Sequence, residues 1–176
     1  MTAASIEEFF GALFHFGDGL IEFRVLPSIS RTFEEPGDLA AVQRFINNHP
    51  HENVYFGVAA RRDKSSGRTE NCSFIRAVFA DIDFKDIPEP EAIIALENFP
   101  LRVSFLVNSG GGFHVYWLLQ NPFDLQKDAK QFKALLRQTA RALGADLGSA
   151  EPAHILRIPG TLNYKYDPPR EVRLVY

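Results

Sequence analysis

Two aspartates at the end of one hydrophobic segment are the first candidates for chemistry. Asp81 and Asp83 close the segment 73–84, SFIRAVFADIDF, whose β-branched and aromatic residues favour a strand. Side chains alternate between the two faces of a strand, so both carboxylates lie on one face, about 5–7 Å apart. Carboxylates this close repel each other unless a cation lies between them, and hard oxygen ligands suit Mg²⁺ or Mn²⁺. The pair indicates a metal site, although a solvated strand end has the same pattern.

A glycine-rich segment, 109–117 (SGGGFHVYW), is the second candidate. Three consecutive glycines allow the backbone to approach a ligand closely and to direct its N–H groups at an anion. Ser109 adds a hydroxyl, and His114 shares a strand face with Gly112, where its imidazole can donate to a phosphate oxygen. We therefore expect Ser109, Gly111 and His114 to bind phosphate. The alternative is a glycine-rich hairpin with a histidine in the core.

The third candidate is the segment 157–165, RIPGTLNYK, which contains Arg157, Asn163 and Lys165. An arginine can grip a phosphate through two parallel hydrogen bonds while a lysine acts as a point charge, so the two together can neutralise a triphosphate. Two carboxylates, Asp146 and Glu151, lie just upstream. A surface turn with ordinary basic residues would have the same composition.

In this order and spacing, the three motifs resemble the archaeo-eukaryotic primase superfamily. The likeness is to the bifunctional primase-polymerase and plasmid RepB-like primase catalytic domains, and it covers roughly residues 54 to 165. The resemblance implies that Asp81, Asp83 and Asp146 hold two Mg²⁺ or Mn²⁺ ions and are the catalytic residues. It also implies a nucleotide-binding set consisting of Ser109, Gly111, His114, Arg157, Asn163 and Lys165.

The resemblance further implies a DNA primase or polymerase that adds nucleotides from nucleoside triphosphates to the 3′-hydroxyl of a strand paired with a DNA template. Two other functions fit parts of the pattern, a non-catalytic module for single-stranded nucleic acid and a metal-dependent nuclease. The zinc-binding insertion of some relatives is excluded, because Cys72 is the only cysteine. Many relatives also have a C-terminal helical module that starts primers. Because the last expected strand runs into the C-terminus with no polar tail, we expect the chain to be excised from a longer protein with a further helical or helicase domain.

Helical and strand patterns alternate along the chain. Each expected helix has an apolar face or end signals, including caps at Ser5 and Asp38 and a stop at Gly144. We expect helices at 5–14, 38–49, 89–98 and 125–144, and strands at 20–26, 53–62, 73–84, 101–108, 113–119, 154–160 and 171–176. This order predicts an α+β, two-layer fold with a mixed or antiparallel, RRM-like sheet and flanking helices. Residues 1–176 then form a single catalytic domain with two lobes around one cleft.

The formal net charge of −3 argues against a broadly basic surface for nucleic acid, so any strand-binding surface must be local. Two basic groups are candidates, one on the helix at 125–144 and one around the polar turn at 63–71; each would also be an ordinary solvated surface. Their members are Lys127, Lys130, Lys133, Arg137 and Arg141, and Arg61, Arg62, Lys64 and Arg68. Tyr116 and Trp117 fit either base stacking or the core.

The sequence has no basic, apolar leader at its start and no uninterrupted apolar run of about 18 residues. A single cysteine excludes a disulfide within the chain and is compatible with a reducing compartment. We therefore expect a cytoplasmic protein with no membrane partner.

Overall fold

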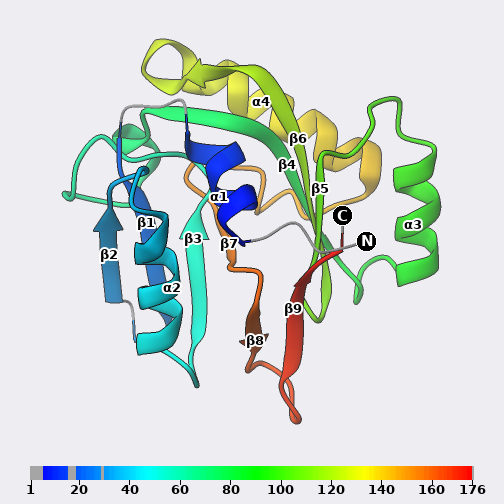
Figure 1. The fold of residues 1–176 in the computed structure, drawn as a ribbon. Coiled ribbons are helices and arrows are strands. Elements are labelled where there is room, and N and C mark those ends of the chain that lie inside the picture. The colour runs from blue at the N-terminus through cyan, green and yellow to red at the C-terminus, as the bar shows by residue number, and fades with distance from the viewer. Residues whose placement is uncertain (1–5, 16–18, 29, 176) are drawn as a thin grey trace.

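Two antiparallel β-sheets form the framework of the computed structural model, which describes residues 6–15, 19–28 and 30–175 (Figure 1). The first sheet has the strand order β2-β1-β3-β7, made of β1 (Ile21–Leu26), β2 (Ser30–Glu34), β3 (Asn53–Gly57) and β7 (Ile155–Arg157). The second has the order β4-β6-β5-β9-β8, made of β4 (Phe74–Asp83), β5 (Phe105–Asn108), β6 (Gly112–Asp124), β8 (Thr161–Asn163) and β9 (Arg170–Leu174). Because β7 comes from the C-terminal half of the chain, the first sheet is completed by a late segment.

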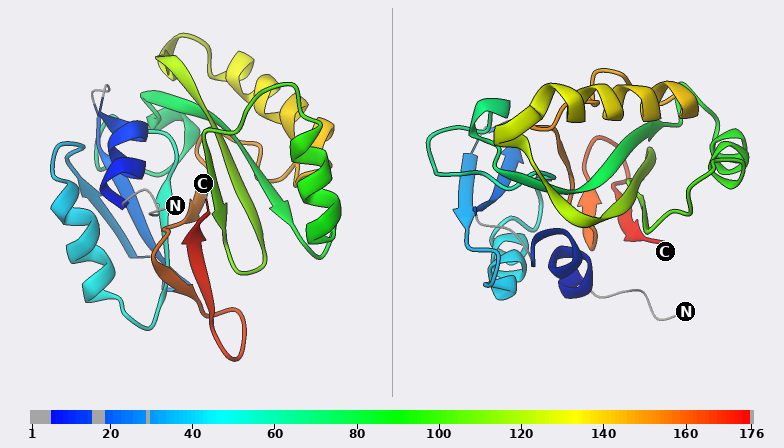
Figure 2. Two further views of the ribbon diagram at one scale, coloured as in Figure 1. Left: turned by 45° about the vertical axis from the view of Figure 1, so that its right-hand side comes forward. Right: turned by 90° about the horizontal axis from the view of Figure 1, so that it is seen from above.

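Helices cover both sides of these sheets (Figure 2). In the view from above, α4 (Leu125–Leu143) lies on one side, and α1 (Ile6–Phe14) and α2 (Leu39–Asn48) lie on the other. α3 (Glu89–Glu97) follows β4 in the chain, and a short 3₁₀ helix, η1 (Thr69–Asn71), lies just before β4. Within the described residues, no helix is long and apolar enough to cross a membrane.

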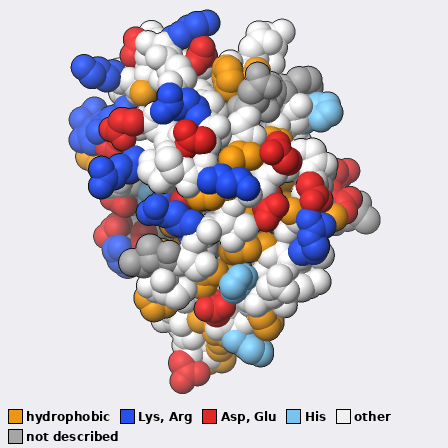
Figure 3. Space-filling model, turned by 90° about the vertical axis from the view of Figure 1, so that its left-hand side faces the viewer, with side chains coloured by type: hydrophobic (Ala, Val, Ile, Leu, Met, Phe, Trp, Pro, Cys, Tyr) orange, Lys and Arg blue, Asp and Glu red, His pale blue; other side chains and the backbone are white. Residues whose placement is uncertain are grey.

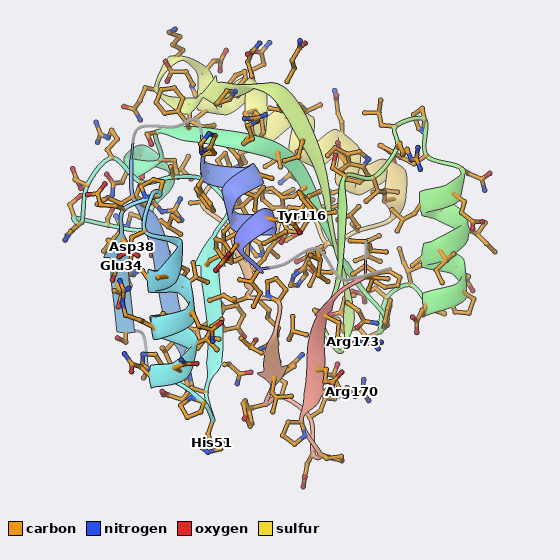
Figure 4. All side chains as sticks on the ribbon, viewed as in Figure 1. Glu34, Asp38, His51, Tyr116, Arg170 and Arg173 are labelled. Carbon is orange, nitrogen blue, oxygen red and sulfur yellow. The ribbon has the colours of Figure 1, made fainter. Side chains whose placement is uncertain are left out.

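Aromatic contacts from α1 join the two sheets. The ring of Phe9 packs edge-on against Phe56 of β3 at 5.7 Å and against Tyr116 of β6 at 5.2 Å, measured between ring centroids. All three side chains are fully buried, and Tyr116 lies in the interior behind α1 (Figure 4). Large aromatic groups remove much apolar area from water, so α1 holds the two sheets together through the core. Tyr116 and the 5%-exposed Trp117 are therefore core residues and not an open stacking surface.

The expected α+β class with flanking helices is confirmed, with two sheets in place of the one that we expected. Asp38 caps α2 by accepting the backbone N–H of Ala41 at 3.1 Å, and Gly144 ends α4 in the left-handed conformation at φ 66°. The expected cap at Ser5 lies outside the described residues.

Three expected strands are clearly shorter in the structure, the strand expected at 113–119 continues to Asp124 as β6, and β8 was not expected. The strand expected at 101–108 is shortened to β5, and the strand expected at 53–62 ends at Gly57 because the following residues bend to place Arg61 inside. The strand expected at 154–160 stops at Arg157, just before Pro159, which has no N–H, and Gly160, which has φ 84°. β2 was not expected, since its sequence SRTFE is mostly polar.

A buried ion pair corrects the interpretation of Arg61 as part of a surface patch. Both Arg61 and Glu22 are 0% exposed, and Arg61 Nε donates to Glu22 Oε2 at 2.7 Å. The other Arg61 nitrogens donate to the carbonyls of Ala59 and Ala153 at 3.1 Å each. Burial raises the pKa of Glu22, but hydrogen bonds and charge from Arg24 and Arg61 outweigh it, so this pKa lies below its ordinary value. Arg61 is therefore a structural residue that ties three segments together.

The polar turn at 63–71 is also more ordered than its composition predicts. Asn71 is 2% exposed, and its side chain donates to the carbonyls of Asp63 and Ser66 at 2.8 and 2.6 Å. Arg62, Lys64 and Arg68 remain exposed on this turn.

The approach of β6 to β4 at Gly112 gives a stability test. Gly112 pairs with Asp83, and a methyl group at Gly112 would overlap the backbone carbonyl of Ile82. Because backbone cannot move aside as a flexible side chain can, we expect Gly112→Ala to lower the free energy of unfolding by about 1–3 kcal/mol. Gly37→Ala is the control, since nothing lies within 4 Å of its added methyl group. Denaturant unfolding measures both, and equal stabilities would contradict this packing.

Candidate active site

One polar pocket of about 300 Å³ lies where residues of the two sheets meet. It brings together eight of the nine site residues expected from the sequence, drawn from β4, the β5–β6 turn, β6, β7, and the segment that begins at the end of β8. These are Asp81, Asp83, Ser109, Gly111, His114, Arg157, Asn163 and Lys165. Residues up to 84 positions apart in the sequence, Asp81 to Lys165, thus surround one space; the ninth, Asp146, is not among the lining residues.

Asp81 lies between two imidazoles. Its Oδ1 is 3.8 Å from Nε2 of His114, and its Oδ2 is 3.8 Å from Nε2 of His154. Burial raises the pKa of Asp81, but the hydrogen-bonding contact with His154, the neighbouring His114 imidazole and the charge of Lys165 outweigh it, so the pKa lies below its ordinary value. Asp81 is therefore a carboxylate at neutral pH and can attract a cation.

Asp83 shares the face of Asp81, as strand alternation predicts. It pairs with Gly112 while Asp81 pairs with His114, and its side chain is 35% exposed. Lys85 donates to Asp83 Oδ2 at 2.7 Å, and this contact raises the pKa of Lys85. The second carboxylate is thus at the open side of the pocket.

His114 is buried and electrically neutral. Its side chain is 5% exposed, and its Nδ1 has no hydrogen-bond partner in the structure. Burial lowers the pKa of His114 to about 4, and the Asp81 carboxylate opposes this only in part. A buried polar atom without a partner is costly in a folded protein, so Nδ1 of His114 marks a place that a ligand or water can satisfy.

The glycine turn between β5 and β6 is held by its own backbone and by Asn163. Ser109 donates both its N–H and its hydroxyl to the carbonyl of Gly112, at 2.8 and 3.1 Å, and Gly110 has φ 82°. Asn163 Nδ2 donates to the carbonyl of Ser109 at 2.8 Å. Only glycine adopts such a φ readily, and a side chain at Gly111 would overlap the hydroxyl of Tyr166. The expected roles of Ser109 and Asn163 thus include fixing the shape of this turn.

Arg157 enters the pocket from the first sheet. Its Nη1 donates to Asn53 Oδ1 at 2.6 Å and its guanidinium lies 4.8 Å from the centre of the Tyr55 ring, while its buried Nη2 has no hydrogen-bond partner. Burial lowers its pKa, although arginine stays protonated in proteins. Lys165 is exposed and lines the same pocket. Together they supply the positive charge that a phosphate group requires.

Asp146 is bonded to Asp81 through its backbone N–H, whereas its carboxylate is bonded to a different residue. Its N–H donates to the carbonyl of Asp81 at 3.0 Å, but its Oδ1 accepts the N–H of Gly148 at 2.7 Å. The rival Glu151 is engaged with Lys133 at 2.5 Å. In the part of the chain that the structure describes, no three His, Cys, Asp or Glu side chains are arranged to hold a metal ion. The three-carboxylate site expected from the sequence is therefore not assembled in this conformation.

Among the lining residues that the sequence motifs missed are two polar ones close to the third motif, His154 and Tyr166. The His154 ring stacks on Phe79 with centroids 6.2 Å apart and planes 14° from parallel. Tyr166 lies against Gly111, and the Arg170 guanidinium lies 3.7 Å above its ring while donating to the carbonyl of Gly110 at 2.8 Å. Arg170 stands near the free end of the hairpin formed by β8 and β9 (Figure 4). The sequence signal that could have found His154 and Tyr166 was their position, since both residues flank the motif at 157–165.

Solved structures with this fold include a primase-polymerase and a primase. The AEP domain of the cyanophage S-2L primase-polymerase aligns at a TM-score of 0.63 and 17% identity, over 93% of this chain and 84% of that one. The chain has a primase-polymerase fold. The catalytic domain of the primase RepB′, in complex with initiator DNA, aligns at a TM-score of 0.64 and 15% identity, over 98% of this chain and 85% of that one. In a longer RepB′ chain the match covers 56% of that chain.

The resemblance to primase-polymerase domains expected from the motifs is thus confirmed at the level of the fold. No protein-family model and no curated protein matches the sequence significantly. At 15–17% identity, the likeness is one of architecture, so the roles of individual residues rest on the geometry of the pocket.

The buried, neutral His114 predicts a pH dependence of stability. Between its ordinary pKa of 6.5 and about 4, the unfolded chain binds a proton at this histidine and the folded protein does not. The free energy of unfolding therefore falls as pH is lowered through this window, by roughly 3 kcal/mol from this group alone. We expect His114→Gln to remove most of that dependence and the exposed His51→Gln to leave it unchanged. Urea unfolding between pH 7 and 4 measures it, and parallel curves for wild type and His114→Gln would contradict the burial of a neutral imidazole.

Proposed function

We propose that this chain transfers nucleotides from nucleoside triphosphates to the 3′-hydroxyl of a DNA strand on a DNA template. The observation that carries the proposal is the convergence of eight motif residues on one pocket, in a fold shared with a primase-polymerase and a primase. We call Asp81 and Asp83 the acidic corner of this pocket, and Arg157, Lys165 and the glycine turn its basic corner. That division matches phosphoryl transfer, in which a negatively charged triphosphate must be bound next to a metal-binding carboxylate.

The basic corner is proposed to bind the triphosphate. The Nη2 of Arg157 is buried without a partner, so a phosphate oxygen would satisfy it and add a charge-assisted hydrogen bond. Lys165 adds a second charge from the exposed side of the pocket. Nδ1 of the neutral His114 has no partner either, so one of its ring nitrogens can donate to the bound group. Arg157 is already held by Asn53 and by the Tyr55 ring, which lets its guanidinium stabilise the charge that develops in the transition state.

The acidic corner fits divalent cations. Asp81 is anionic and faces the pocket beside Asp83, and paired carboxylates are the oxygen donors that Mg²⁺ and Mn²⁺ prefer. In this proposal Asp81 and Asp83 hold two ions, which when bound lower the pKa of the attacking hydroxyl and neutralise the triphosphate.

Asp146 is proposed as the third carboxylate. Its backbone is already joined to that of Asp81, so ligation requires a change in its side chain and the loss of one hydrogen bond to Gly148. Glu151 would have to give up a close ion pair with Lys133. Asp146 is therefore the better candidate of the two.

The DNA partner is proposed from the fold together with the basic side chains. A RepB′ primase domain with the same fold is described in complex with initiator DNA. On this chain, the buried positions of α4 are apolar except for Thr139, whereas Lys127, Lys130 and Arg141 are exposed. The two alternative functions, strand binding without catalysis and strand cleavage, share this surface and differ in the products that they leave.

Extension of a labelled primer on a template with Mn²⁺ tests the proposal. We expect wild-type protein to lengthen the primer and Asp81→Asn to reduce the rate at least about 100-fold, since an amide keeps the shape of the carboxylate but not its charge. Asp86→Asn is the control, because Asp86 is exposed and also contacts Lys85. Melting curves show that each variant is folded.

Four outcomes are distinguishable in the same experiment. A lengthened primer supports the proposal, whereas a shortened one identifies a nuclease. DNA binding without any product identifies a binding module. If Asp81→Asn kept more than about a tenth of the wild-type rate, a change of less than about 1.4 kcal/mol in the barrier, the role of Asp81 would be wrong.

A further inference from the structure

A second hollow adjoins the active-site pocket and shares His154 with it. It has a volume of about 370 Å³ and is formed by the turn around η1 and the segment after α4. Its main polar lining consists of Arg68, Thr69, Glu70, Gly148, Glu151 and His154. The active-site pocket and this second hollow are therefore neighbouring spaces with the His154 imidazole at their boundary.

His114 and His154 each lie near a different carboxylate oxygen of Asp81. His114 faces Oδ1 from the strand that follows the glycine turn, and His154 faces Oδ2 from the side of the second hollow. In phosphoryl transfer, the attacking oxygen and the leaving group lie roughly in line on opposite sides of the phosphorus atom. If the triphosphate occupies the corner of Arg157, the attacking hydroxyl must enter from another side, and the hollow at His154 offers one.

The charges around the second hollow fit a nucleic-acid backbone at its rim. Arg68 is exposed, and Thr69 supplies a hydroxyl. Lys133 of α4 reaches Glu151 at 2.5 Å and so compensates the charge of this carboxylate. Figure 3 shows the Lys and Arg side chains of this side of the molecule gathered in its upper half, with acidic residues among them. Of the two acidic lining residues, Glu151 pairs with Lys133, whereas Glu70 makes no ion pair with any described residue, so its charge opposes phosphate binding.

Asp146 is also connected to the second hollow. Its Oδ1 is bonded to the N–H of Gly148, which lines the second hollow. A third carboxylate approaching from here would meet the ion nearest the attacking hydroxyl. Its position is thus consistent with a strand end arriving over His154.

We propose that the second hollow binds the 3′-terminal part of the primer strand and guides its hydroxyl past His154 to Asp81. This inference rests on the proposed function and specifies where its strand substrate lies. Arg68 contacts a backbone phosphate, and Glu70 weakens the same contact by repulsion. The two neighbouring residues therefore act on DNA affinity in opposite directions.

The test compares two substitutions with opposite expected effects. The affinity of a fluorescein-labelled primer-template with a dideoxy 3′ end is measured by anisotropy at several salt concentrations, and nucleotide affinity is measured separately. We expect Arg68→Ala to weaken DNA binding roughly 5- to 10-fold and to reduce the slope of log K against log salt by about 1. We expect Glu70→Gln to tighten DNA binding about 2- to 5-fold, because it removes one negative charge near the phosphates.

Neither change should alter nucleotide affinity, since both residues lie outside the active-site pocket. Arg44→Ala is the control, because Arg44 is an exposed arginine on α2 that pairs with Asp38. Unchanged DNA affinity and salt slope in both hollow variants, with normal extension by the wild type, would overturn this inference alone. No nucleotide binding and no extension by the wild type would instead refute the proposed function.

Discussion

Backbone pairing between β7 and β3 determines whether a site exists at all. The register sets Arg157 opposite Tyr55 and Leu156 opposite Phe56, so a segment from the C-terminal half of the chain completes the first sheet. Asp81 and His114, in contrast, sit opposite one another in the second sheet. The chain passes from β7 in the first sheet to β8 in the second within four residues, through Pro159 and Gly160. Without this crossing, Arg157 of the first sheet would not lie in one pocket with Asp81, Asp83 and the glycine turn of the second sheet.

The buried Glu22–Arg61 ion pair also helps to hold the segment that leads into β7. A buried charge pair is costly unless each partner is fully hydrogen-bonded, and Arg61 meets this condition with a carboxylate and two carbonyls. One of those carbonyls belongs to Ala153, the neighbour of His154. The core polar network therefore fixes the backbone at the residue that borders Asp81, and packing in the first sheet is connected to geometry in the site.

Sequence patterns predicted what depends on local periodicity. The alternation in β4 was sufficient to place Asp81 and Asp83 on one face, and the apolar spacing of α4 together with Gly144 was sufficient to set its end. These two features are short-range, so each is encoded within a few residues. The order of the three motifs along the chain also indicated a primase-polymerase fold.

What the sequence did not predict depends on long-range contacts. Arg61 looks like a surface residue because it begins a polar run, and only its contact with Glu22, 39 positions earlier, makes it a core residue. His154 lies outside the three motifs, and its proximity to Asp81 follows from the β3–β7 pairing. The direction of the Asp146 carboxylate is set by one hydrogen bond to Gly148, which composition cannot reveal.

Central to the proposed function is a pocket between the sheets that binds metal at its acidic corner and triphosphate at its basic corner. Crystals grown with Mn²⁺ and a non-hydrolysable nucleoside triphosphate test it most directly, through the anomalous scattering of manganese. The account predicts anomalous peaks at the carboxylates of Asp81 and Asp83, with the triphosphate against Arg157 and the glycine turn. Manganese or nucleotide bound elsewhere on the protein, with this pocket holding only water, would contradict it.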